Sequence, residues 1–574
     1  MSKARWFVLS VSILMVAAIL MTACKPAATQ APAVQPPAQQ ATEAPAEQAA
    51  TEAPAEAAAT EAPVVEEGPQ VGGTFVYSSV EEPDTLDIYK SAFAITSSVT
   101  SNIGGSLVAK NYDGQMVPFL AKSWEISEDG LTYTFHLRDD VKFHNGEPFT
   151  AHDYVWTWDR CLGEDFVCPV SASLLTFTYE ATDDYTLVLH LAAPNYYTIS
   201  NLGAMDYLQP LNQKAVEAAG DTYGMGTTAV GVGPYMIKEW VQDEKIILTR
   251  NPDFTWGPEY FEGGNTGPYY VEELEFRILP DLATQLAGLE ANELDYGSVE
   301  AKDLEIVKNT GYYEVYDLVA PGFTFISFNL RNEKFSDVRV REALNLATDK
   351  ATLVQVVLNG QGAVLDGPLA EAMIGYDEAA MKGTGAKFDV EAAKALFEEA
   401  GFTYGSDGML IDPEGQPFTI NLMTTTEEQS TKLVTMLVDM WKQVGVAVTV
   451  EQLEWGTMAP KVFAGEYEAC TMGIGWPDAD IMYMMFHSSQ IGAVNFHFTQ
   501  DADLDALLDK ARNEIDAAAH QEAVNAAYKL VQDQSYIVPM FSAYTFLAVS
   551  NDFQGIVQSP FIYLITSDMY YAGN

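Results

Sequence analysis

The sequence predicts an α/β protein with at least two domains. Up to about residue 280, short runs alternate apolar with polar residues, which is typical of half-buried strands. Beyond that point, amphipathic segments begin at Asp or Ser and end near Gly, as helices do. The 574 residues, of which 48% are hydrophobic, exceed what a single hydrophobic core usually serves.

The strand pattern is clearest at 131–138, LTYTFHLR, where every second side chain is apolar. The segments GGTFVYSS (72–79) and TLVLHL (186–191) are also predicted strands. GVGPYMIKEW (231–240) is predicted to be a Gly/Pro turn that leads into a strand. A helix is expected after Thr150, because Asp153 three residues later completes a capping box.

The helix pattern continues through the second half of the chain. Asp281 and Asp389 are expected N-caps, and Gly401 follows the helix that Asp389 opens. The further predicted helices cover 336–350, 427–444, 501–516 and 519–533, and strands are expected at 446–453 and 537–550.

Charge narrows the range of partners. The formal net charge is −50, and the first 70 residues hold only 7 acidic and 3 basic side chains. Nearly all of the negative charge therefore belongs to the remainder of the chain. Such a field repels nucleic acid and anionic membrane surfaces, so neither is expected to be the main partner.

The N-terminus reads as a secretory signal. Lys3 and Arg5 precede an apolar run from Trp6 to Met21 that is short for a membrane span. The following Thr22-Ala23-Cys24 resembles a bacterial lipobox, in which the cysteine thiol carries the lipid. Residues 1–23 are therefore predicted to be a lipoprotein signal peptide and Cys24 the lipidation site.

Residues 24–70 are predicted to be a disordered linker. The segment is rich in Ala, Pro and Glu, and ATEAPAEQA at 41–49 recurs as ATEAPAEAA at 50–58 and in part as ATEAP at 59–63. Three short polar copies with regular prolines cannot build a core. A lipid, a spacer and a globular body together predict a domain tethered outside a membrane.

Three further cysteines are present. Cys161 and Cys168 lie seven residues apart, and an exported location permits a disulfide between them. Cys470 would then be an unpaired, buried small side chain.

Catalytic motifs are missing from the sequence. It contains no GxSxG, HExxH or GxxxxGK[ST] pattern, and its seven histidines form no i,i+4 pair. We therefore expect no enzyme activity, no metal and no cofactor.

The order of several motifs resembles family 5 of the bacterial extracellular solute-binding proteins, the dipeptide, oligopeptide and nickel receptors of ABC importers. The segment 104–153, with VPFLAKSWEISEDGLTYTFHLRDDVKFHNGEPFT, is similar to the longest family motif. EEPDTLD (81–87), GVGPY (231–235), RNPDFTW (250–256) and the segments 335–350, 392–402 and 503–512 follow in family order. The resemblance covers about 80–574.

This resemblance implies a two-lobed periplasmic-binding-protein-like fold (type II, in the three-part family-5 arrangement) with a hinge between the lobes. Lobe I would combine 71–110, 231–320 and 535–574, with a strand-rich subdomain at 111–230, and lobe II would be 321–534. The segments 321–329 and 537–546 are the candidate crossing strands. Ligand binding would shift the lobes from open towards closed.

The stretch GIGWPDADIMYMM (473–485) is the predicted ligand site. Peptide-binding relatives resemble Gly-Trp-x-x-Asp-Tyr-x-Asp-Pro here, and an aspartate pairs with the peptide α-ammonium. This sequence has a shorter form, so either Asp478 takes that role or the cleft suits another ligand. The predicted ligand-binding residues are Trp476, Asp478, Asp480, Tyr483, Trp455, Asn329 and Tyr77.

The resemblance thus predicts the substrate-binding component of an ABC importer, monomeric and tethered to the outer face of the cytoplasmic membrane, in a periplasm or at the cell exterior. Its partners would be a peptide and the permease subunits. An oligosaccharide or another small solute is the alternative ligand, because Trp476, Tyr483 and Trp455 could stack on sugar rings. A surface sensor without an importer is the alternative role.

Overall fold

The computed structural model describes residues 69–573 except 92, 165, 170, 205, 320 and 560–563. The predicted signal peptide and Cys24 lie outside these residues, as does the linker apart from residues 69 and 70. Among the described residues, no helix combines the length and apolar character that crossing a membrane requires.

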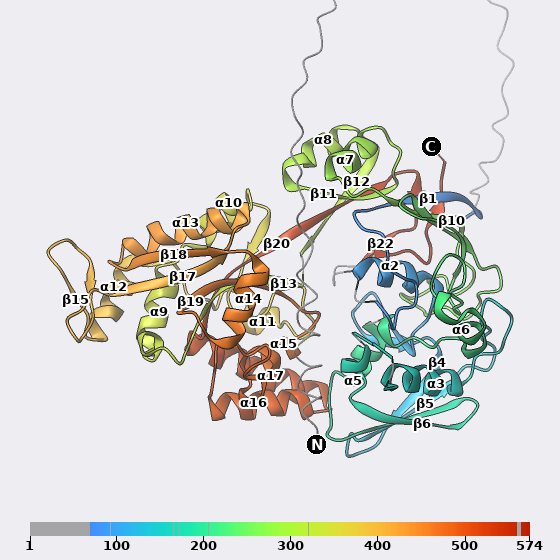
Figure 1. The fold of residues 1–574 in the computed structure, drawn as a ribbon, viewed down its shortest axis with the longest axis horizontal. Helices are drawn as coiled ribbons and strands as arrows, with labels where there is room; N and C mark the ends of the chain where they lie inside the picture. Colours follow the sequence, from blue (N-terminus) through green and yellow to red (C-terminus); the bar gives the residue numbers. More distant parts are fainter. Residues whose placement is uncertain are drawn as a thin grey trace, which may run out of the picture. The chain divides into compact units, whose positions relative to one another are not determined.

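A mixed sheet of twelve strands dominates the described part of the chain (Figure 1). Its main order is β18-β17-β19-β13-β20-β11-β1-β10-β9-β8, and β12 and β14 also pair with β20. In chain order these strands are β1 (Gly72–Ser79), β8 (Tyr235–Val241), β9 (Lys245–Arg250), β10 (Val271–Ile278), β11 (Tyr296–Val299), β12 (Tyr313–Val319), β13 (Gly322–Phe328), β14 (Gly362–Val364), β17 (Thr419–Thr425), β18 (Ala447–Leu453), β19 (Ala469–Gly475) and β20 (Ile537–Ser550).

Strand β20 connects the two halves of this sheet. Its first residues pair with β13, with Ile537 opposite Ser327. Its last residues pair with β11 and β12, with Val549 opposite Tyr296. Figure 1 shows β20 as one long arrow that runs past β13 towards β11 and β12. The segment 537–546 therefore crosses between two groups of strands, as predicted.

The strand-rich segment forms a separate antiparallel sheet, ordered β4-β5-β7-β6. In β5 the alternation predicted from the sequence is confirmed, because Tyr133, Phe135 and Leu137 are buried while their neighbours are partly exposed. The strands are β4 (Ala121–Ile126), β5 (Thr132–Leu137), β6 (Phe177–Asp183) and β7 (Thr186–Leu191), and nearby β2 (Val108–Lys110) pairs with β3 (Met116–Pro118).

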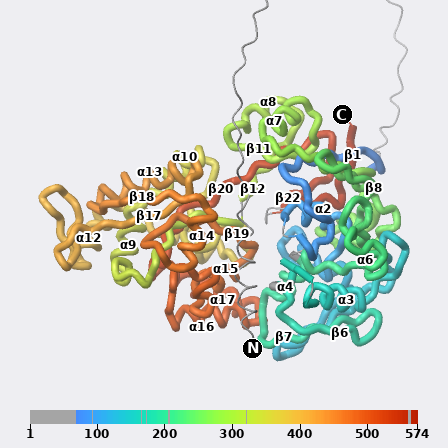
Figure 2. Tube along the Cα trace, in the orientation of Figure 1, coloured from blue at the N-terminus to red at the C-terminus, as the bar shows by residue number. Residues whose placement is uncertain are grey.

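Helices cover the sheets and fill the second half of the chain. They are α2 (Ala94–Ile103), α3 (Ala151–Leu162), α4 (Ser171–Leu174), α5 (Thr198–Ala204), α6 (Gln213–Ala219), α7 (Leu282–Glu290), α8 (Leu304–Asn309), α9 (Val338–Leu346), α10 (Lys350–Val357), α11 (Glu378–Met381), α12 (Val390–Glu399), α13 (Glu428–Lys442), α14 (Trp455–Ala464), α15 (Asp480–Phe486), α16 (Ala502–Asn513) and α17 (Ala517–Asp533). Figure 2 shows α16 and α17 running side by side, with α15 next to them.

The predicted helix caps are confirmed. The Asp153 carboxylate accepts a hydrogen bond from the Thr150 backbone N–H at 2.8 Å, which closes the capping box of α3. Asp281 and Asp389 cap α7 and α12 by accepting from backbone N–H groups three residues on. Each cap satisfies N–H groups that a helix start leaves without partners.

The helix predicted over 336–350 is present as α9 but is shorter, because it ends at Leu346 and a separate helix, α10, begins at Lys350. Thr348 lies between the two helices. The Thr348 hydroxyl donates to the Leu344 carbonyl and accepts from the indole N–H of Trp441 at 3.1 Å. Asp349 then caps α10.

The GVGPY turn is needed for a close approach of two backbones. A side chain at Gly231 would place its Cβ 1.8 Å from the Ile103 carbonyl oxygen. At Gly233 the corresponding distance to the Gly104 carbonyl oxygen is 2.5 Å. Both are shorter than any van der Waals contact, so the end of α2 packs directly on this turn.

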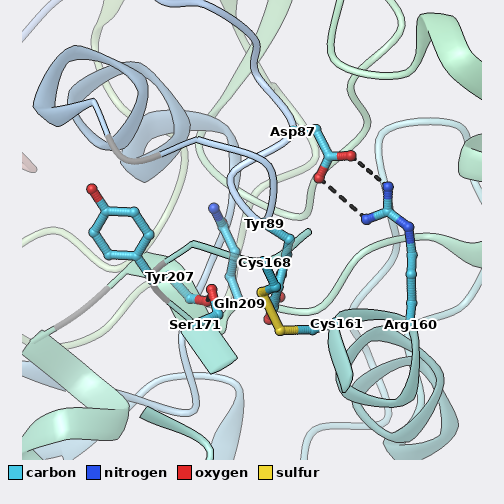
Figure 3. Close-up of a disulfide and its surroundings, with 8 residues drawn as sticks. All are labelled: Asp87, Tyr89, Arg160, Cys161, Cys168, Ser171, Tyr207 and Gln209. Atoms are coloured by element: carbon cyan, nitrogen blue, oxygen red, sulfur yellow. Dashed lines mark hydrogen bonds and ion pairs between the residues drawn. A yellow bond between two sulfur atoms is a disulfide. The ribbon is translucent and has the colours of Figure 1, made fainter. Parts of the chain in front are cut away.

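A disulfide joins Cys161, at the end of α3, to Cys168 (Figure 3). Next to it, the Arg160 guanidinium binds both oxygens of the fully buried Asp87 carboxylate, at 2.5 and 3.2 Å. Cys470 is free and buried in β19, as predicted. Burial raises the pKa of its thiol far above the usual value.

The buried apolar residues fall into separate clusters. The largest runs from Phe75 to Phe276 and takes in Val549 and Phe553 near the C-terminus. Two others contain only residues between Phe323 and Phe541. A protein with one core would not divide in this way, and the clusters fit the two-lobed fold class.

Candidate ligand-binding site

The predicted stretch lies where β19 gives way to α15. Its backbone is held from both sides. The Trp476 N–H donates to the Pro321 carbonyl at 2.7 Å. On the other side, the Ile374 N–H donates to the Pro477 carbonyl at 3.0 Å, and the Ala479 N–H donates to the Ile374 carbonyl at 2.8 Å. These contacts fix the loop without using any side chain of Asp478.

Asp478 is a buried carboxylate whose hydrogen-bond donors, the Asp480 backbone and the Trp476 side chain, come from its own loop. Its exposed fraction is 3%, and its Oδ1 accepts the Asp480 backbone N–H at 3.1 Å. Burial, together with the negative charge of Asp480, raises the pKa of Asp478 to about 7, while hydrogen bonds and Lys110 oppose the rise. Ionised Asp478 is therefore costly unless a positive group lies nearby.

Asp480 has a cationic partner within the chain. Arg512 on α16 donates from Nη2 to the Asp480 Oδ2 at 2.8 Å. Burial raises the pKa of Asp480, and Arg512 opposes this rise. The remaining oxygen, Oδ1, is buried and has no hydrogen-bond partner among the described residues. Asp480 is thus a structural partner of Arg512.

Lys110, at the end of β2, is the positive group that faces Asp478. Burial lowers the pKa of Lys110, and the charge of Asp478 opposes this. The sequence reasoning missed this residue. A single lysine in the otherwise apolar run LVAK, in a chain with only 30 basic residues, was the available signal.

Tyr483 packs within its own lobe. The Arg512 guanidinium lies 4.0 Å from the centre of its ring, and the ring stacks on His487 at 4.3 Å. These contacts hold Arg512 in position for Asp480.

Trp455 and Trp476 lie at the margin of the hydrophobic cluster that also contains Tyr483. Trp455 is the first residue of α14, and both indoles are half-buried. The structure therefore brings five of the predicted residues into one region: Trp455, Trp476, Asp478, Asp480 and Tyr483.

Asn329 lies elsewhere. In the β13–β19 pair, Gly322 is opposite Gly475 and Phe328 is opposite Ala469. Asn329 is therefore at the other end of the strand from Trp476, a distance of about 20 Å. Its amide donates to the carbonyls of Gly465 and Tyr467, both at 2.9 Å, so it fastens a loop there.

Tyr77 also lies apart from this group. It is on β1, where its ring stacks on Phe276 at 4.8 Å and contacts Tyr296. These residues belong to the cluster of the N-terminal half or pack against it.

Two tyrosines from the strand-rich segment reach the same region and were not predicted. The Tyr196 N–H donates to the Arg512 carbonyl at 2.8 Å, and its ring stacks on His520 at 3.5 Å. Tyr197 is buried, and its pKa is raised by burial and by the charges of Asp478 and Asp480. Two adjacent tyrosines in a loop form no sequence pattern that would predict their position near Asp478 and Arg512.

The arrangement is suited to binding a cation. The Asp478 carboxylate lies beside the half-buried indole of Trp476, and a charged amino group would satisfy Asp478 by a charge-assisted hydrogen bond. Within the described residues, no three His, Cys, Asp or Glu side chains converge as metal ligands would.

Comparisons with known proteins agree with this picture. Residues 115–493 match the family model described as bacterial extracellular solute-binding proteins, family 5 middle. The oligopeptide-binding protein AppA of Bacillus subtilis is 25% identical over 480 residues, covering 82% of this chain and 86% of AppA. The periplasmic oligopeptide-binding protein OppA of Haemophilus influenzae is 28% identical over 520 residues, covering 83% of this chain and 90% of OppA.

Solved structures share the fold. HbpA2 of Haemophilus parasuis aligns with a TM-score of 0.75 at 26% identity, covering 87% of this chain and all of HbpA2. AppA in complex with a nonapeptide aligns with a TM-score of 0.65 at 23% identity, covering 88% of this chain and all of AppA. The chain belongs to family 5 of the bacterial extracellular solute-binding proteins.

Proposed function

We propose that this protein is the substrate-binding component of an ABC importer and captures peptides with a free α-ammonium group between two closing lobes. Relatives along most of the chain are named oligopeptide-binding and dipeptide-binding proteins. It delivers the peptide intact, without chemical turnover.

The observation that carries this proposal is the state of Asp478. Asp480 is neutralised by Arg512, so Asp478 is the carboxylate that an incoming ammonium would pair with. The charge of Lys110 also acts on Asp478. In this proposal Trp476 and Trp455 supply apolar walls for the peptide side chains.

The lobes proposed for closure are 71–110 with 231–320 and 535–574, and 321–534, with the subdomain 111–230 attached to the first. The crossing segments are those around 321 and within β20, because these join the two groups of strands. Closure about a few strand residues is the usual motion of two-lobed binding proteins.

We further propose that the chain is exported and anchored through a lipid on Cys24, with 24–70 as the spacer. The apolar run before Cys24 and the repeated linker support this. Labelling with a radioactive fatty acid tests it, because Cys24→Ser should abolish incorporation.

Mass spectrometry of the ligand that copurifies with the protein tests the function. The protein is purified without denaturant, then unfolded to release what it holds. We expect peptides with free N-termini. Recovery of an oligosaccharide, or of another non-peptide solute, would overturn the peptide assignment. Incubated peptide recovered as fragments would contradict binding without turnover.

A further inference from the structure

A cavity lies in the C-terminal half of the chain, and no residue of the stretch 473–485 lines it. Its volume is about 820 Å³, which is ample for a small molecule. Its walls come from α9, α17, the 366–386 loop and the start of β20. Ile537 and Pro539 line it and pair with Ser327 and Phe325 of β13. It therefore lies towards the opposite end of β13 from the loop that holds Trp476.

Most polar side chains that line this cavity already have partners. Asn525 donates to the Asp377 carboxylate at 2.7 Å, and Ser535 donates to the Gln532 carbonyl. The Lys529 ammonium is paired with Asp533 at 2.7 Å. These groups shape the cavity but do not require a ligand.

Asn345 and Tyr528 are the exceptions, because the buried Tyr528 hydroxyl also has no hydrogen-bond partner among the described residues. Asn345 is on α9. Its side chain lines the cavity, its exposed fraction is 7%, and its Oδ1 has no hydrogen-bond partner among the described residues. A buried acceptor without a donor costs about 1–3 kcal/mol. A ligand with an N–H donor would remove that cost.

The charge of the lining is negative. Glu342, one helical turn before Asn345, also lines the cavity and makes no ion pair within the described residues. Asp366 accepts backbone N–H groups of Gly383 and Gly385 at 2.7 and 3.0 Å, with Lys350 behind it. The Glu342 carboxylate thus has no compensating charge among the described residues, and the Asp366 carboxylate accepts hydrogen bonds from two backbone N–H groups.

We propose that this cavity is a second ligand site that takes a small aliphatic amine. The ammonium group would pair with Glu342 and Asp366 and donate to the Asn345 Oδ1. This site is independent of the proposed peptide function, because none of the residues that line it belongs to the stretch 473–485. No group of three His, Cys, Asp or Glu side chains that could hold a metal ion is found there or elsewhere in the described part of the chain.

Isothermal titration calorimetry of the full chain tests the proposal with n-butylamine and putrescine, and with n-butanol as the neutral counterpart. We expect saturable binding of an amine at about 1 mM or below and none of n-butanol. Glu342→Gln should weaken amine binding about tenfold, because it removes one charge-assisted hydrogen bond. Glu522→Gln, an exposed change on α17 outside the cavity, is the matched control and should leave affinity unchanged.

Asp366→Asn is the second variant, and its melting temperature reports whether the 366–386 loop stays intact. Glu342→Gln keeps the test valid if Asp366→Asn does not fold. Absence of saturable amine binding overturns the proposal, and so does equal binding of n-butanol. Amine binding that survives Glu342→Gln but is lost in Asp478→Asn would place the amine in the other site and also overturn it.

Discussion

Replacing Asp478 by asparagine should stabilise the ligand-free protein at neutral and alkaline pH. The carboxylate is 3% exposed, and its pKa rises from 3.8 to about 7 on folding. Asparagine has nearly the same shape, and its Oδ1 can still accept the Asp480 N–H that Asp478 accepts at 3.1 Å. The substitution therefore removes a charge without opening a cavity.

The size of the effect follows from linkage. A rise from 3.8 to about 7 corresponds to about 4 kcal/mol at 1.36 kcal/mol per pKa unit. Because the folded pKa is the higher one, the folded protein binds the proton more tightly. Stability from this group is thus present below pH 4 and is lost as the pH rises through 7. The asparagine side chain does not titrate, so the variant has no such loss and gains stability over wild type only above about pH 4.

Thermal unfolding of the ligand-free protein from pH 4 to pH 8 measures this difference in stability between wild type and Asp478→Asn. Wild type and Asp478→Asn should melt together at pH 4, and the variant should melt progressively higher as the pH rises. Asp439→Asn, on α13 and outside the site, controls for loss of one negative charge. Parallel curves for Asp478→Asn and wild type, or a variant that is less stable at pH 8, would refute the reasoning.

Three further changes test other parts of the structure. Arg512→Met leaves Asp480 buried and unpaired, so it should cost about 3 kcal/mol in urea unfolding at pH 8. Burial raises the pKa of Asp480, so a cost that did not shrink as the pH falls would argue against the ion pair. Cys168→Ser should lower stability by about 2 kcal/mol and abolish the effect of dithiothreitol on the melting temperature; an unchanged effect would exclude the disulfide. Asp153→Ala should cost about 1 kcal/mol through loss of the α3 capping box, while Asp153→Asn should cost less, and equal costs would count against capping.

Local features were the ones that sequence reasoning predicted well. The capping box of Thr150 and Asp153 involves residues three apart, so its pattern is visible in the sequence. The burial alternation of β5 is likewise a property of neighbouring residues. The hydrogen bond between Trp441 and Thr348, which lies between α9 and α10, was not predictable, because the two residues lie 93 positions apart in the sequence.

The candidate site was predicted only in part, because its local stretch is visible in the sequence and its long-range contacts are not. The family resemblance identified the stretch that contains Trp476, Asp478 and Asp480. The resemblance could not show which cation each aspartate has. Arg512 binds Asp480 from α16, and Lys110 acts on Asp478 from β2, and both are distant in the sequence. Asn329 was also predicted to bind the ligand, but it follows β13 at the opposite end of the β13–β19 pair from Trp476.

The central claim is that Asp478 binds the α-ammonium of a peptide. Calorimetric titration of one copurified peptide, with a free or an acetylated N-terminus, measures it in wild type and in Asp478→Asn. The account predicts that acetylation and Asp478→Asn each weaken binding by about a hundredfold, and that acetylation has little further effect in the variant. Equal affinity of wild type for the free and the acetylated peptide would contradict it.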